Sequence, residues 1–167
     1  MIQGITETGI SAEICTEDNR IDTSVATTQI RFLVKFINDL DGSIEYTYPA
    51  LAEAAGENTR TFPRYTRMVF IYYLLNPPLF FGGIHLKPAG HWKYEVYEVS
   101  WIGTVSLTVE TAPQTETQVL FVADTNGVVQ GIVTKGILNL TEKAGTEQVQ
   151  YTQHTEPTGT NTIYYGQ

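Results

Sequence analysis

Hydrophobic and polar residues alternate along most of the chain from about Thr66 onward, in short runs separated by Gly, Pro, Asn or Asp. In the clearest run, 91–99, Trp92, Tyr94 and Val96 share one face, and charged residues are interleaved on the other. A period of two is typical of a half-buried β-strand, because successive side chains point to opposite faces of a sheet. Several short strands at this spacing predict an all-β sandwich or barrel.

The first half of the chain contains a hairpin signal and a helix signal. Residues 30–36 alternate and lead through Asp41-Gly42 into a second alternating run at 43–48. Asp-Gly between two such runs favours a hairpin, because Gly tolerates the positive φ that the turn demands. The segment Pro49–Gly56 starts with Pro, is rich in Ala and ends with Gly, an order that predicts one short helix.

The other strand signals follow the same plan. The most apolar run, 66–75, is expected to be a central strand covered on both faces. Gly131 and Gly136 predict bulges or breaks in the strand that contains them. Further strands are predicted at 84–87, 103–110, 119–123, 128–140, 148–153 and 161–165.

Residues 1–28 are polar and rich in Thr and acids, with isolated Ile residues. Isolated branched residues cannot make a core of their own, so any order in this segment has to come from elsewhere. We therefore expect an extended N-terminal arm at 1–28, either mobile or lying on a partner. A single β-sandwich domain is expected at 29–167, because 167 residues, 42% of them hydrophobic, suffice for one core.

Composition narrows the classes of partner. The formal net charge of −8 repels phosphate backbones, so we expect no nucleic-acid partner. Cys15 is the only cysteine, which excludes an intrachain disulfide and favours folding in a reducing cytoplasm. Residues 1–7 lack the basic start and apolar run of a signal peptide. The longest apolar run, 68–75, is too short to cross a bilayer, so no membrane partner is expected either.

Catalytic, cofactor and metal sites are not predicted. The three histidines and Cys15 are scattered rather than clustered as zinc ligands would be. No Gly-x-Ser-x-Gly elbow, phosphate loop or dinucleotide fingerprint is present. Glu95 and Glu98 lie on opposite faces of one predicted strand because their separation is odd, so they are interpreted as solvent-facing charges rather than as a glycosidase pair.

The aromatic residues divide into two groups. Trp92 and Trp101 lie in or beside strongly patterned strands and are predicted to pack in the core, with a sugar-stacking platform as the alternative. Aromatic pairs in a loop and near the C-terminus are better candidates for contact with a partner. Together with three Ile residues of the N-terminal arm, they form the predicted partner interface: Ile2, Ile5, Ile10, Phe80, Phe81, Tyr164 and Tyr165.

One strand carries a family resemblance. Residues Gly90–Glu98 read Gly-His-Trp-Lys-Tyr-Glu-Val-Tyr-Glu, and similar segments flank them over most of the chain beyond residue 28. The matching segments are Phe32–Gly42, Arg64–Phe70, Gly90–Glu98, Gly136–Glu142 and Gln150–Tyr165. In these segments the chain resembles the auxiliary or decoration proteins on the heads of tailed bacteriophages, particularly the crAss-like group.

The resemblance implies an Ig-like antiparallel β-sandwich and a non-enzymatic structural virion protein. Such a protein would be made in the host cytoplasm and bound to the outer surface of a phage capsid, without a cofactor. The major capsid protein is the expected partner, with other virion proteins as further candidates. The helix-like Pro49–Gly56 and the long N-terminal stretch depart from shorter versions of the pattern and leave the capsid shell, a fibre base and the tail open as locations. The alternative is a carbohydrate-binding or adhesion module of a head fibre or tail.

Overall fold

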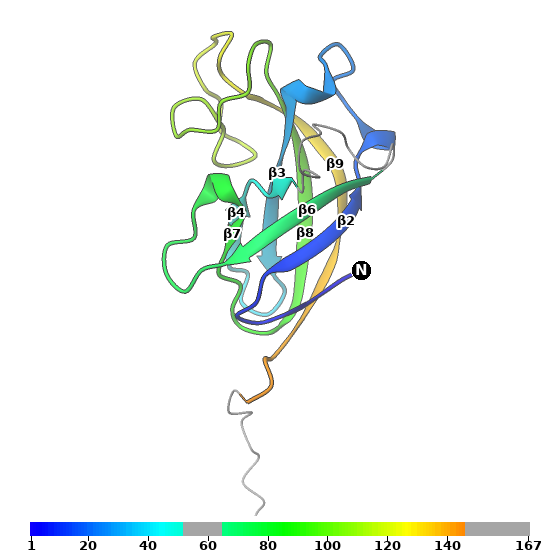
Figure 1. Ribbon diagram of the computed structural model, residues 1–167, viewed down its shortest axis with the longest axis vertical. Coiled ribbons are helices and arrows are strands. Elements are labelled where there is room, and N and C mark those ends of the chain that lie inside the picture. Colours follow the sequence, from blue (N-terminus) through cyan, green and yellow to red (C-terminus); the bar gives the residue numbers. More distant parts are fainter. Residues whose placement is uncertain (52–64, 146–167) are drawn as a thin grey trace, which may run out of the picture.

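The computed structural model describes residues 1–51 and 65–145, which form two packed β-sheets (Figure 1). The prediction of an all-β sandwich is confirmed. Helical structure in the described residues is confined to three single 3₁₀ turns: η1 (Glu17–Asn19), η2 (Thr27–Gln29) and η3 (Leu79–Phe81). The strands predicted at 148–153 and 161–165 lie outside the described residues.

The larger sheet contains five strands in the order β1-β9-β8-β3-β4. Their bounds are β1 (Ile2–Ile5), β9 (Val128–Thr141), β8 (Gly90–Ser100), β3 (Ile30–Asn38) and β4 (Ile44–Thr47). The hairpin predicted around Asp41-Gly42 joins β3 to β4, with Val34 opposite Thr47 and Ile37 opposite Ile44. The alternating run 91–99 forms β8 at the centre of this sheet, antiparallel to both β3 and β9.

The second sheet packs across the first. It has the order β2-β6-β5, with β7 paired beside β6. The bounds are β2 (Ile10–Cys15), β5 (Ala50–Leu51), β6 (Tyr65–Tyr72) and β7 (Gly83–Ile84). Both sheets are mixed rather than antiparallel throughout, because β1 runs parallel to β9 and β7 runs parallel to β6. The other strand pairs are antiparallel, as expected for the sandwich.

The predicted helix at Pro49–Gly56 is also corrected where the structure describes it. Ala50 and Leu51 form β5 and pair with Val69 and Met68 of β6. A short Ala-rich run gains little from helix propensity, because helix nucleation is costly, whereas pairing with an existing strand is available here. Residues 52–56 of the predicted helix lie outside the described residues.

The N-terminal segment belongs to the sandwich. Residues 2–5 and 10–15 are extended, as expected, but they pair with β9 and β6 in different sheets. Ile10 and Ile14 are buried, at 5% and 4% exposure. The expectation of an arm outside a domain that begins at residue 29 is thus corrected. The physical reason is that Ile10, Ala12 and Ile14 alternate with polar residues and supply one apolar face of an amphipathic strand.

The main core lies between the two sheets. From the larger sheet, β3 contributes Phe32 and Phe36 and β8 contributes Trp92, and these side chains meet Met68 and Phe70 from β6. The Phe36 and Phe70 rings pack edge to face, with centroids 5.3 Å apart. Trp92 is 1% exposed, which confirms its predicted place in the core.

A second core covers the opposite face of the larger sheet near one end. Leu33 of β3 and Tyr97 of β8 are cross-strand partners on this face, and both pack with Trp101, Ala112 and Tyr48. Trp101 is fully buried, as predicted. Much of the cover over this second core is the long connection between β8 and β9, residues 101–127, which we name the 101–127 loop. Strands predicted at 103–110 and 119–123 fall in this loop and are not strands in the structure.

The glycines of β9 have different roles. The β8–β9 register shifts between Val96 and Tyr97 and again between Glu98 and Val99, next to Gly131, so the bulge predicted there is confirmed. Gly136 lies directly opposite Tyr94 in regular pairing. A Cβ at Gly136 would lie 2.5 Å from the Tyr94 hydroxyl oxygen, so any side chain at this position would displace the Tyr94 ring.

Candidate interaction surface

The 101–127 loop is held closed at its base by backbone hydrogen bonds. The Gly103 amide donates to the Asp124 carbonyl at 3.1 Å, and the Gly127 amide donates to the Thr111 carbonyl at 2.8 Å. The Trp101 amide donates to the Gln29 carbonyl at 2.9 Å, which ties the start of the loop to η2. Residues without regular secondary structure thus have a defined conformation at the end of the sandwich.

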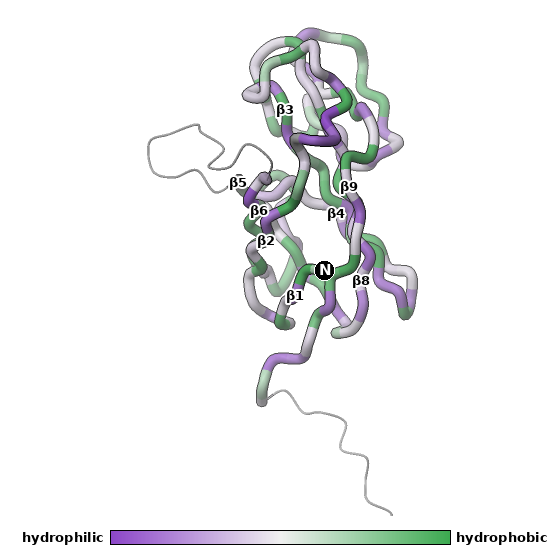
Figure 2. Tube along the Cα trace, turned by 90° about the vertical axis from the view of Figure 1, so that its right-hand side faces the viewer, coloured by the Kyte–Doolittle hydropathy of each residue, from purple (hydrophilic) through white to green (hydrophobic). Residues whose placement is uncertain are grey.

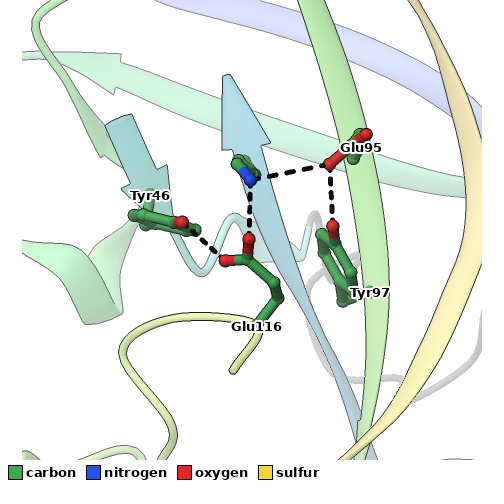
Figure 3. Close-up of polar contacts among 5 residues, drawn as sticks. Tyr46, Glu95, Tyr97 and Glu116 are labelled. Carbon is green, nitrogen blue, oxygen red and sulfur yellow. Dashed lines mark hydrogen bonds and ion pairs between the residues drawn. The ribbon is translucent and has the colours of Figure 1, made fainter. Parts of the chain in front are cut away.

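The loop is also attached to the sheet beneath it. Tyr48 donates its hydroxyl to the Pro113 carbonyl at 2.6 Å, and this bond is buried. Glu116 makes the second attachment: Lys35 of β3 donates to Glu116 Oε1 at 2.6 Å, and Tyr46 of β4 donates to Glu116 Oε2 at 2.5 Å (Figure 3). Both carboxylate oxygens of Glu116 therefore accept a hydrogen bond from the larger sheet.

Glu95 of β8 completes this polar cluster. Tyr97 donates to Glu95 Oε2 at 2.7 Å, and the Lys35 Nζ lies 3.9 Å from the same oxygen (Figure 3). The side chains of Lys35, Glu95 and Glu116 are 13%, 26% and 19% exposed. One cation thus serves two carboxylates in a largely desolvated setting, where charge-assisted hydrogen bonds are stronger than at an open surface.

The pKa directions match this geometry. Burial raises the pKa of the Glu116 carboxyl, but hydrogen bonds from Lys35, Tyr46 and a backbone amide, with the charge of Lys35, outweigh burial, and the net pKa lies below its usual value of 4.5. Burial, followed by the hydrogen bond to Glu116, raises the pKa of Tyr46. A general acid of a glycosidase needs a carboxyl whose pKa is raised, not lowered. The lowered pKa of Glu116 therefore fits an ionised carboxylate that anchors the loop and not a general acid of this kind.

The far end of the loop exposes apolar side chains. Val119, Phe121 and Val122 are 91%, 88% and 90% exposed, and Leu120 between them is partly buried. We name residues 119–122 the apolar tip. Figure 1 places the 101–127 loop, drawn green to yellow, at the top of the molecule, and Figure 2 shows hydrophobic stretches in the loops at that same end. Contiguous exposed apolar side chains are candidates for contact with a partner.

The charged residues that flank the apolar tip in the sequence are all acidic. No Lys or Arg occurs between Lys93 and Lys135. Glu110 and Asp124, both within the loop, are exposed acids. The apolar tip is thus flanked in sequence by negative charge only.

The predicted partner interface is only partly exposed. Ile5 and Phe81 are 47% and 68% exposed, so both are accessible to a partner, and their place in an interface stays a prediction. Ile10 is wrong as an interface residue because it lies in the main core, and Ile2 is partly buried against that core. Phe80 is partly buried, because it packs against the second core with its ring centroid 5.8 Å from that of Tyr48. Tyr164 and Tyr165 lie outside the described residues.

Sequence reasoning missed the apolar tip because it interpreted 119–123 as an ordinary strand of the sandwich. No direct signal in the sequence indicates an exposed segment. A strand needs a neighbouring strand to pair with, whereas turns flank this segment and leave it at the end of a long connection. It also missed the pairing of Glu116 with Lys35, since no local spacing connects a loop carboxylate to a strand 81 positions earlier.

Sequence reasoning also missed the burial of Glu98. It was interpreted as a solvent-facing charge, but its side chain is fully buried. The Glu98 carboxylate accepts hydrogen bonds from the Ile21 amide at 3.1 Å and from the Asp22 amide at 2.7 Å. It therefore fixes the segment between β2 and β3 against β8.

Trp92 and Trp101 are both inaccessible in the cores, so neither provides a surface for stacking sugars. Within residues 1–51 and 65–145, no group of three or more His, Cys, Asp or Glu side chains is placed to hold a metal ion. No helix in the described part of the chain has the length and apolar character needed to cross a membrane.

Comparisons of the chain with protein-family models, with curated proteins and with solved structures found no match.

Proposed function

We propose that this chain is a non-enzymatic structural virion protein, an auxiliary protein that binds the outer surface of a phage capsid and stabilises the shell or presents a surface. The observation that carries the proposal is the apolar tip, whose three most exposed side chains are 88–91% accessible on a loop anchored to the sandwich. An anchored apolar segment loses little conformational entropy on binding, which favours attachment to a larger assembly.

The choice of a capsid as the assembly rests on the resemblance of Gly90–Glu98 and its flanking segments to decoration proteins. Two features of the molecule agree with this role. The ion pairs of Lys35 with Glu95 and Glu116 hold the 101–127 loop on the larger sheet, which supports a structural role. The burial of both Trp side chains weighs against the carbohydrate-binding alternative.

The test is co-sedimentation of the purified chain with assembled capsids that lack it. Saturable binding, with a fixed number of copies per shell, is the expected result. A stable attachment of this kind buries roughly 800 Å² on each partner. Absence of binding at micromolar protein would overturn the capsid role, and a glycan array would then decide whether the adhesion alternative takes its place.

A further inference from the structure

The apolar tip has the residue types of a β-strand, but it does not pair with a strand in the described residues. Val119, Phe121 and Val122 are residue types that favour extended, paired backbone. In the described parts of the chain, however, the amides of residues 119–122 donate to no backbone carbonyl. The segment therefore has free backbone donors together with exposed apolar side chains, which are the two groups that an added strand uses when it pairs with an open sheet edge.

Hydrogen bonds on both sides of this segment hold its ends in place. On one side the Gln118 amide donates to the Thr115 carbonyl at 3.2 Å, next to the anchored Glu116. On the other side the Asn126 amide donates to the Ala123 carbonyl at 3.0 Å. The Asn126 side chain also donates to the Phe121 carbonyl at 2.5 Å. Such preorganisation lowers the entropic cost of pairing with a partner.

The negative charge around the apolar tip favours some binding partners over others. Glu110 and Asp124 are exposed acids in the same loop, no basic residue occurs between 94 and 134, and the whole chain carries −8. A second copy of the chain would bring like charges together, and an anionic lipid surface would be repelled. An apolar cleft or sheet edge with Lys or Arg around it has the complementary charge.

We propose that the apolar tip docks as an added β-strand on an open sheet edge of the capsid protein, with basic residues of that protein around the site. This inference rests on the proposed function, which supplies the capsid protein as the partner. It differs from attachment through the N-terminal segment, because residues 2–5 and 10–15 already pair within the sandwich.

The first test measures binding to capsids lacking the protein, with a variant that carries Val119→Ser, Phe121→Ser and Val122→Ser. The matched control is Leu74→Ser with Leu75→Ser, which removes apolar side chains that are 64% and 77% exposed elsewhere. We expect the tip variant to bind at least about 10-fold more weakly, as interface anchors do, and the control to bind like wild type. Unfolding temperatures of both variants should match wild type, because the altered side chains are exposed.

Two further variants separate strand addition from simple apolar contact. Val119→Pro and Leu120→Pro each remove one backbone donor, and adjacent amides in a strand point to opposite sides. Strand addition predicts that one of the two weakens capsid binding markedly more than the other. Asp124→Lys with Glu110→Lys should weaken binding and reverse its dependence on salt, because it would replace attraction to a basic rim by repulsion.

The outcomes are distinct. Wild-type binding that is unchanged in the triple Ser variant would overturn the docking site while leaving the capsid role intact. Equal binding by both Pro variants and wild type would overturn strand addition. Failure of the wild-type chain to bind capsids would overturn the proposed function and the occupant inferred from it. Concentration-dependent dimerisation that is lost in the triple Ser variant would instead identify a second copy as the occupant.

Discussion

Lys35 on β3 and Glu116 in the 101–127 loop form an ion pair with 2.6 Å between Nζ and Oε1, although 81 positions separate them in the chain. The same Nζ lies 3.9 Å from Glu95 on the neighbouring strand β8. A single cation on the outer face of the larger sheet therefore helps to fix where the loop meets the sandwich. The position of the apolar tip depends on this contact, together with the bond from Tyr48 to Pro113.

Replacing Lys35 by Met should destabilise the protein. The change keeps most of the apolar stem but leaves the Glu95 and Glu116 carboxylates close together without their cation. We expect a loss of about 1–3 kcal/mol in the free energy of unfolding, measured by urea denaturation. The control is Lys93→Met, which breaks an ion pair with Asp39 whose side chains are 60% and 51% exposed. Exposed pairs contribute little to stability, so equal losses in the two variants would contradict a special role for Lys35.

The contribution of Glu116 should depend on pH in a defined direction. The pKa of its carboxyl lies below 4.5 in the folded protein, because its hydrogen bonds, led by those from Lys35 and Tyr46, and the charge of Lys35 outweigh burial. A carboxyl with a lowered folded pKa adds stability that is complete above its unfolded pKa and is lost as the pH falls through the folded pKa. Wild type should therefore be more stable than Glu116→Gln above about pH 5, and the difference should shrink below pH 4.5.

The measurement is the free energy of unfolding of both proteins across this pH range. Taking the difference between them removes the contributions of Asp22 and Asp39, whose pKa values are also lowered. A difference that stays constant from neutral pH to below pH 4 would contradict the assignment of the anchor to the ionised Glu116.

The N-terminal strands should be required for folding. Ile10 is 5% exposed in the main core, so Ile10→Ala is expected to cost about 2–5 kcal/mol. Ile5 is 47% exposed, and Ile5→Ala should cost well under about 1 kcal/mol. Deletion of residues 1–15 removes β1 and β2 and should abolish the cooperative unfolding transition followed by circular dichroism. A truncated chain that unfolds with the wild-type free energy would restore the interpretation of this segment as a separate arm.

Local pattern was sufficient for the elements whose signal lies within a few residues. The alternation of Trp92, Tyr94 and Val96 predicted β8 and its buried face, and Asp41-Gly42 predicted the β3–β4 hairpin. These predictions succeeded because the period of a strand and the φ requirement of a turn are properties of the backbone itself. The same logic fails where a segment has the composition of a strand but no partner, as at Val119–Val122.

For Glu98, the expectation that a charged residue faces solvent was stronger than the strand parity that places it on the core side. Its position has the same parity as Trp92, Tyr94 and Val96, which places it on the core side of β8. Its charge suggested solvent instead, because a buried carboxylate requires partners that the local sequence does not show. The partners are the amides of Ile21 and Asp22, 77 and 76 positions away. Contacts across such separations follow from the assembled topology and cannot be inferred from spacing along the chain.

Gly127 should be intolerant of a side chain, which would test the packing at the base of the 101–127 loop. A Cβ at this position would lie 2.5 Å from Trp101 Cζ2 and 2.9 Å from Val99 Cγ1, and the Trp101 ring is fully buried. Gly127→Ala is therefore expected to cost about 1–3 kcal/mol through overpacking. The control Thr125→Ala changes an exposed residue two positions away and should be nearly neutral. Thermal unfolding of both variants, followed by tryptophan fluorescence, gives the comparison. If Gly127→Ala were as stable as wild type, the end of the loop would be free to move away from Trp101, and the anchored presentation of the apolar tip would lose one of its supports.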